Sequence, residues 1–73
     1  MQGVSSLKLI INGDAIEIPD SVKTVSELLV HFQLDQKVVI VEKNKEILQK
    51  EDHVAENVQD GDQFELVHFV GGG

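Results

Sequence analysis

The fold is decided near the carboxyl end, by the segment Gln63-Phe64-Glu65-Leu66-Val67-His68-Phe69-Val70. In an extended strand, alternate side chains point to opposite faces, and here both faces are largely apolar. The two sets are Phe64, Leu66 and His68 on one face and Val67 and Phe69 on the other. A strand of this kind belongs in the interior of a sheet. The sequence leaves open which of its faces meets a helix.

Three glycines, Gly71, Gly72 and Gly73, follow this strand without a polar linker. Glycine has no side chain to bury and great backbone freedom, so we expect a slender, mobile arm that extends about 10 Å. The arm carries the unhindered α-carboxylate of Gly73, which is ionised at neutral pH. A frayed end or a cloning remnant is the alternative. We favour a functional tail, because the glycines follow the apolar strand so abruptly.

Length and composition narrow the classes of function. A chain of 73 residues forms one domain that buries roughly 60% of its unfolded surface, which favours a binding or carrier role over catalysis. Thirteen acidic residues against six lysines give a net charge of −7. This charge argues against nucleic acid as a binding partner and predicts a protein partner with a basic surface. The chain has no cysteine, no apolar run of membrane-spanning length and no signal-peptide pattern, so we expect it in the cytoplasm.

The amino-terminal part is expected to form a hairpin. Residues 1–6 are small and polar, and we interpret them as a disordered end or a cloning remnant ahead of a domain that spans residues 7–70. Strand alternation begins near Leu7, and Asn12-Gly13 is a strong signal for a two-residue hairpin turn. The second strand is expected from about Ala15 to Ile18, where Pro19 ends it.

One helix is expected next. Thr24-Val25-Ser26-Glu27 fits a capping box, in which the side chains of the first and fourth residues bond to each other's backbone amides. The residues Val25, Leu28, Leu29 and Phe32 form an apolar stripe with helical spacing that must pack on the sheet. Because no glycine follows, Gln33 or a neighbour is expected to adopt the terminating conformation.

Two further strands precede the last one. The β-branched run Val38 to Val41 predicts a third strand, and Lys43-Asn44-Lys45 a polar turn. The segment Glu46-Ile47-Leu48 is expected to be a short strand at a sheet edge. In the irregular segment that follows, Val54 and Val58 are expected to anchor the chain in the core.

The predicted element order is strand, strand, helix, strand, strand, strand. This order indicates an α+β roll, a mixed sheet of four to five strands with one helix on one face. If the first and last strands pair at the centre, the glycine tail, residues 71–73, leaves the body from the middle of the sheet.

Metal binding is not expected. His31, His53 and His68 lie far apart in the sequence without cysteine companions, whereas a zinc site needs about four convergent ligands. The acidic residues between Glu51 and Asp62 lack the ligand spacing of an EF-hand. Solvated surface is the preferred interpretation of both sets.

Phe69 and Val70 have two interpretations. So close to the tail, they either form a docking site for a partner, together with His68, or complete the core. The sequence favours neither.

Several segments together resemble the small ubiquitin-like (β-grasp) sulfur carriers, above all the ThiS-type carriers of thiamine biosynthesis. The resemblance covers nearly the whole chain. The segments are Ile11-Asn12-Gly13, Thr24 to Leu29, Val38 to Ile47, Asp60-Gly61-Asp62 and Gly72-Gly73.

This resemblance implies a β-grasp fold and a protein substrate rather than an enzyme. A ThiF-like adenylyltransferase would use ATP to adenylate Gly73, and a sulfur donor such as a cysteine desulfurase would supply the sulfur of a thiocarboxylate. A ThiG-like thiazole synthase would accept this sulfur. Gly71 and Gly72 would thread into the partners, and no cofactor would stay bound to the carrier. Three glycines stand where the family pattern needs two; we take Gly73 as the working terminus, with Gly72 as the alternative.

Three other functions remain open. The chain could carry sulfur for molybdopterin synthesis, or be a protein modifier that is joined to lysines. It could also be a non-covalent interaction domain whose glycines are inert.

Overall fold

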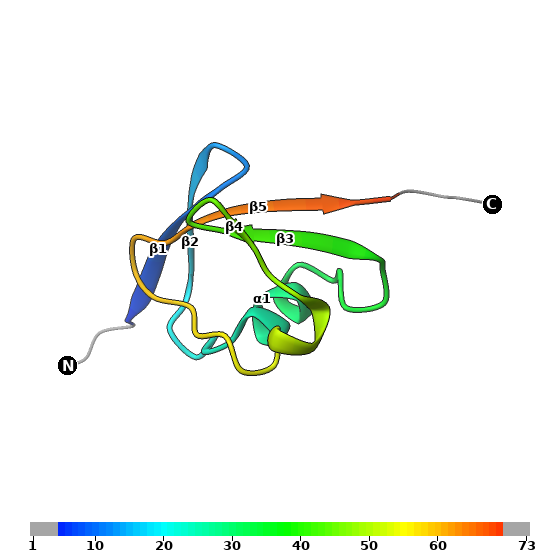
Figure 1. Cartoon of the computed structure of the whole chain (residues 1–73). Coiled ribbons are helices and arrows are strands. Elements are labelled where there is room, and N and C mark those ends of the chain that lie inside the picture. Colours follow the sequence, from blue (N-terminus) through cyan, green and yellow to red (C-terminus); the bar gives the residue numbers. More distant parts are fainter. Residues whose placement is uncertain (1–4, 70–73) are drawn as a thin grey trace.

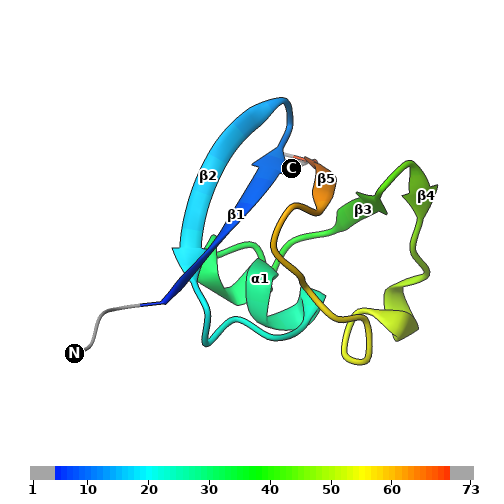
Figure 2. The same ribbon diagram turned by 90° about the vertical axis from the view of Figure 1, so that its left-hand side faces the viewer.

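The computed structural model describes residues 5–69 and shows a five-stranded mixed sheet with one α-helix against one face (Figures 1 and 2). The strand order is β2-β1-β5-β3-β4, which confirms the predicted roll. In chain order the elements are β1 (Ser6–Ile11), β2 (Asp14–Pro19), α1 (Val25–His31), β3 (Val39–Lys43), β4 (Glu46–Ile47), the 3-10 helix η1 (Lys50–Asp52) and β5 (Gln63–His68).

The first hairpin forms as the sequence predicts. Asn12 and Gly13 both have positive φ angles, 51° and 87°, as a tight turn between twisted antiparallel strands requires. β1 begins at Ser6, one residue before the expected boundary, and the Ser6 hydroxyl donates to the Glu17 carboxylate.

β5 is an interior strand, as predicted. It pairs with β1 in parallel, Ile10 with Gln63 and Ile11 with Phe64, and with the whole of β3 in antiparallel orientation. Phe64 and Leu66 are buried against the helix side. This settles which face of β5 meets the helix and leaves Val67 on the opposite, outer face of the sheet.

The helix begins with the predicted capping box. The Thr24 hydroxyl accepts from the Glu27 amide at 3.2 Å, and the Glu27 carboxylate accepts from the Thr24 amide at 3.2 Å. At the other end Gln33 adopts φ 61°, and two backbone bonds close the helix, Gln33 N–H to the Val30 carbonyl and Leu34 N–H to the Leu29 carbonyl. This is a Schellman motif with glutamine where glycine is usual.

One apolar core joins the helix to the sheet. Val25, Leu28 and Leu29 of the helical stripe are buried, while Phe32 is only partly so. The buried apolar residues are Leu9, Ile11, Ile18, Val22, Val25, Leu28, Leu29, Val41, Val58, Phe64 and Leu66. Within residues 5–69 no helix is long and apolar enough to cross a membrane.

Two expectations about the middle of the chain are wrong. Val54 is 71% exposed, and the buried residue beside it is His53. The turn of η1 brings His53 inward and leaves Val54 outside, which strand or helix periodicity does not predict for an irregular segment. Val58 is buried as expected. The third strand begins at Val39, and Val38 before it is exposed.

Lys43 is also not a turn residue. It is the last residue of β3, and its ammonium group contacts the Glu56 carboxylate at 2.9 Å, the Asn57 carbonyl at 2.8 Å and the Asp62 carboxylate at 3.6 Å. These contacts fasten the segment before β5 to the sheet. β4 ends at Ile47, one residue early, and lies at the sheet edge as predicted.

Candidate functional site

The end of β5 is the part of the described structure nearest to the tail. In Figure 1 this end lies across the molecule from the start of β1. Phe69 is the last described residue, so the predicted tail residues Gly71, Gly72 and Gly73, and the predicted docking residue Val70, lie outside the described residues.

Three exposed apolar side chains lie on the outer side of the sheet, near the end of the described chain. Ile40 of β3 pairs directly with Val67 of β5, and Phe69 follows two residues later. Their exposed fractions are 44%, 51% and 63%. We call these three residues the outer patch. Contiguous exposed apolar side chains are typical of interaction sites, and the exposed Phe69 does not complete the core within residues 5–69.

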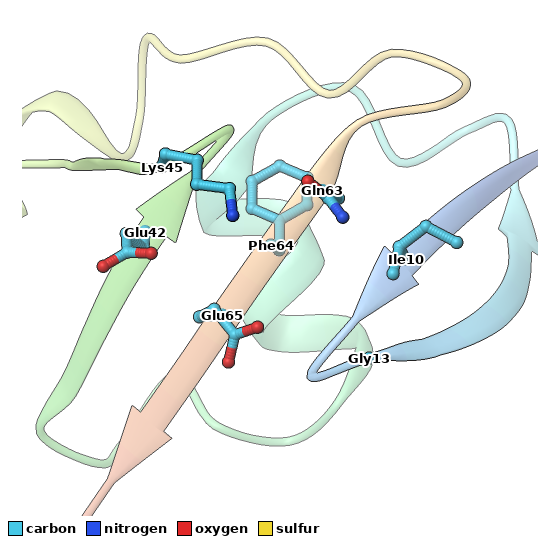
Figure 3. Close-up of a pocket in the computed structure, with 7 residues that line it drawn as sticks. All are labelled: Ile10, Gly13, Glu42, Lys45, Gln63, Phe64 and Glu65. Atoms are coloured by element: carbon cyan, nitrogen blue, oxygen red, sulfur yellow. The ribbon is translucent and has the colours of Figure 1, made fainter.

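Two carboxylates adjoin the outer patch. Glu42 and Glu65 are directly opposite each other in the β3–β5 register, and like charges in that position destabilise a sheet. Among residues 5–69, the ion pairs involve Lys43 rather than either of them. Figure 3 shows both beside Lys45 and Gln63, around a small cavity of about 80 Å³. The outer face therefore joins apolar and acidic groups close to the tail.

His68 does not share a surface with Phe69. It is the last residue of β5 on the inner face, where it is partly buried and lines a cavity of about 260 Å³ with Phe32 and Asp14. Its Nδ1 is buried and has no hydrogen-bond partner among the described residues. Strand alternation separates His68 from the outer patch, so the predicted docking group is split between two faces.

Asn12 has a role that its turn position did not reveal. Its Oδ1 accepts from the Leu66 amide at 2.8 Å, and its Nδ2 donates to the Leu66 carbonyl at 3.2 Å. These bonds continue the β1–β5 ladder after β1 has turned away. Asn12 thus fixes the part of β5 that leads to the tail, with an amide that mimics a backbone peptide group.

The histidines do not assemble into a metal site. Within residues 5–69, no three histidine, aspartate or glutamate side chains are close enough together to hold a metal ion. Burial lowers the pKa of His53, an effect that the nearby Asp52 carboxylate opposes and Lys50 reinforces.

The comparisons with known proteins agree with this geometry. The model of the ThiS family matches residues 8–73. The chain is 45% identical over 63 residues to the sulfur carrier protein ThiS of Bacillus subtilis (strain 168), an alignment that covers 86% of this chain and 96% of that protein. It is also 42% identical over 67 residues to a thiazole synthase of Paramagnetospirillum magneticum, and this alignment covers 92% of the chain but only 20% of the synthase.

Solved structures show the same fold. The crystal structure of the thiamine biosynthesis protein ThiS from Geobacter metallireducens matches with a TM-score of 0.77 and 36% sequence identity, over 92% of this chain and all of that one. The solution structure of a thiamine biosynthesis protein from the same organism matches equally well, over 88% of its length. The family match over most of the chain, the similar carrier and the shared β-grasp fold lead to one conclusion: the chain belongs to the ThiS family.

Proposed function

We propose that this protein carries sulfur for thiamine biosynthesis as a thiocarboxylate on the terminal carboxyl group of Gly73. The observation that carries the proposal is the similarity to the Bacillus subtilis sulfur carrier over almost the whole of both chains. The central position of β5 supports it, because the strand that leads to the tail is held on both sides.

The chemistry requires activation, because a carboxylate does not exchange oxygen for sulfur unaided. A carboxylate oxygen of Gly73 attacks the α-phosphorus of ATP, and pyrophosphate leaves. A sulfur nucleophile from the donor then attacks the acyl carbon and expels AMP. When the nucleophile is a persulfide of the donor, the product is an acyl disulfide; a thiol then attacks the donor-side sulfur, forms a new disulfide with the donor and releases Gly73 as the thiocarboxylate. The carrier contributes the acyl group and its presentation, and the partner enzymes contribute the catalysis.

A ThiF-like adenylyltransferase is the proposed activating partner. The outer patch, defined by Ile40, Val67 and Phe69, offers it an apolar contact beside the tail. Glu42 and Glu65, with Lys45 beside them, leave a local excess of negative charge that a basic side chain of the partner would neutralise. Since the chain has a net charge of −7, we expect the rate of association to fall as salt is added.

A ThiG-like thiazole synthase is the proposed acceptor of the sulfur. A stretch similar to this chain occurs within the thiazole synthase of Paramagnetospirillum magneticum, which is consistent with a carrier that works next to a synthase. Gly71 and Gly72 lack side chains and would let the tail enter a narrow channel in each partner. ATP belongs to the activating step, and the carrier needs no resident cofactor of its own.

An intact-mass measurement tests the proposal. The purified protein is incubated with ATP, a ThiF-type adenylyltransferase and a sulfur donor, with a Gly73-deleted chain as the control. We expect a mass gain equal to sulfur replacing one oxygen in the full chain only. No gain, with an adenylyltransferase proven active on its own carrier, would contradict the proposal. An equal gain in the control would move the working terminus to Gly72, and conjugates of higher mass would indicate a protein modifier.

A further inference from the structure

A groove lies between the end of α1, the segment that leads into β3, and η1 with the residues after it. Its volume is about 410 Å³, within the size range of sites that bind small ligands or side chains. Leu29, Leu34 and Val39 contribute to its lining, and each of them also belongs to the core or packs against it. The groove walls are therefore fixed by the fold.

Exposed valines collect at this groove. Val30, Val38 and Val54 all line it, and they are three of the seven large apolar residues that are exposed within residues 5–69. They come from three separate segments of the chain, so neither a single helical stripe nor a strand face explains their gathering. Exposed apolar side chains that converge on a concave surface indicate an interaction site. Val54, which was expected in the core, is one of these residues.

The charge balance at the groove is the reverse of that in the whole chain. Acidic residues outnumber lysines thirteen to six overall. The residues that line the groove include two lysines, Lys37 and Lys50, and one acidic residue, Asp35. Neither lysine belongs to an ion pair among residues 5–69. The Asp35 carboxylate accepts from the side-chain Nε2 of the neighbouring Gln36 at 3.3 Å. The groove thus offers two cations beside an apolar surface.

His53 provides an independent observation at the same place. It lines the groove, only 6% of it is exposed, and its Nε2 has no hydrogen-bond partner among the described residues. Buried polar atoms of native proteins almost always have a partner, and an exception calls for an explanation. Burial lowers the pKa of His53, and its Nε2 is closed to solvent beneath the lining of the groove.

We propose that this groove binds a segment of a partner protein in which an apolar side chain stands next to an aspartate or glutamate. The apolar side chain packs among Val30, Val38 and Val54. The carboxylate pairs with Lys37 and Lys50. Val38 lies two residues before Ile40, so one partner can cover the groove and the outer patch together. The inference does not depend on sulfur transfer at Gly73.

A second copy of the chain is the competing occupant, since it too has many carboxylates. Two copies with a net charge of −7 each repel one another, whereas a short acidic segment meets mainly the local lysines. We therefore assign the groove to a different protein and make self-association an outcome of the test.

Backbone amide shifts of the ¹⁵N-labelled full chain test the proposal at low salt. The probe is the blocked peptide acetyl-Glu-Leu-Val-Glu-amide, and its matched control has glutamine in place of both glutamates. We expect saturable shifts at Val38, His53 and Val54 with the acidic peptide, and binding that is weaker by roughly threefold or more with the neutral one. The difference should shrink as salt is added.

Variants on the rim complete the test. Lys37→Gln with Lys50→Gln should weaken binding of the acidic peptide roughly threefold or more, whereas Lys8→Gln, on the outer face of β1, should not change it. Val54→Asp should abolish binding without unfolding the chain, because this side chain is exposed. The proposal fails if the two peptides bind equally, if the lysine changes have no effect, or if the shifts arise elsewhere. It also fails if unlabelled copies of the chain reproduce the same shifts.

Discussion

The two faces of β5 carry similar residues with opposite fates. Phe64 and Leu66 on the inner face are 1% and 6% exposed, whereas Val67 on the outer face and Phe69, the residue just after the strand, are 51% and 63% exposed. Both pairs consist of one aromatic and one aliphatic side chain, so residue type does not separate them. The helix covers only the inner face (Figure 2). The inner residues therefore stabilise the fold, and the outer residues remain available for a partner beside the tail.

The largest expected effect is on the inner face. Phe64→Ala removes a fully buried ring and should lower the free energy of unfolding by about 3–5 kcal/mol, a large part of the stability of so small a domain. Urea unfolding followed by circular dichroism measures it. A loss of less than about 1 kcal/mol would mean that the inner face does not hold the fold together.

Asn12 matters to both faces of β5, because its hydrogen bonds to the Leu66 backbone hold the strand that carries them. Asn12→Ala removes both hydrogen bonds to Leu66 and should cost about 1–2 kcal/mol of unfolding free energy. Protection of the Leu66 amide from hydrogen exchange should fall in parallel. Asn12→Asp, which keeps the acceptor and loses the donor, should be intermediate in amide protection. Unchanged protection in Asn12→Ala would show that this end of β5 needs no clamp.

A substitution at Phe69 should lower the activity and leave the stability nearly unchanged. Phe69→Ala should reduce kcat/KM for thiocarboxylate formation by about tenfold and change the melting temperature little, because the ring is already exposed. Gln59→Ala, at an exposed position of the loop before β5, is the control and should leave both nearly unchanged. A large loss of stability in Phe69→Ala would rule out the docking role.

His53, which is buried, should make the free energy of unfolding depend on pH. Because burial lowers its pKa from 6.5, the unfolded chain binds more protons than the folded chain just below that value. The contribution of neutral His53 to the free energy of unfolding should therefore be fully present above pH 6.5. It should be lost as the pH drops through 6.5 toward the lower pKa of the folded state. Urea midpoints between about pH 7.5 and pH 5.5 measure the slope. His53→Asn should flatten it, and an equal slope in that variant would assign the effect to another group.

The smallest expected change is a gain at the helix end. Gln33 has a φ of 61°, a conformation that is unfavourable for residues other than glycine. Gln33→Gly should raise the free energy of unfolding by about 0.5–1 kcal/mol, since the relief of strain exceeds the added freedom of the unfolded chain. The outer face should be unaffected, so thiocarboxylate formation should keep its rate. A loss of stability would mean that the Gln33 side chain makes a contact of greater value than the strain.

Local rules were sufficient wherever neighbours in the sequence decide the structure. The Asn12-Gly13 turn, the Thr24 and Glu27 capping box and the termination of the helix at Gln33 are all as expected. Each depends on backbone geometry or on a hydrogen bond between residues only a few positions apart. The interior position of β5 in the strand order was also predictable from the apolar residues on both its faces, although its outer face stays exposed.

By itself the sequence determined the element order and the α+β roll, since periodicity and turn residues are local properties, and its motifs carried the family resemblance that implied the β-grasp fold. Only the tertiary structure decided which face of β5 is covered, that His53 rather than Val54 turns inward, and that Lys43 points to Glu56. It also brought Ile40 beside Val67, and the lysines beside the exposed valines of the groove. The physical reason is that these contacts join residues distant in the chain, and their partners are fixed only once the strands have chosen their neighbours.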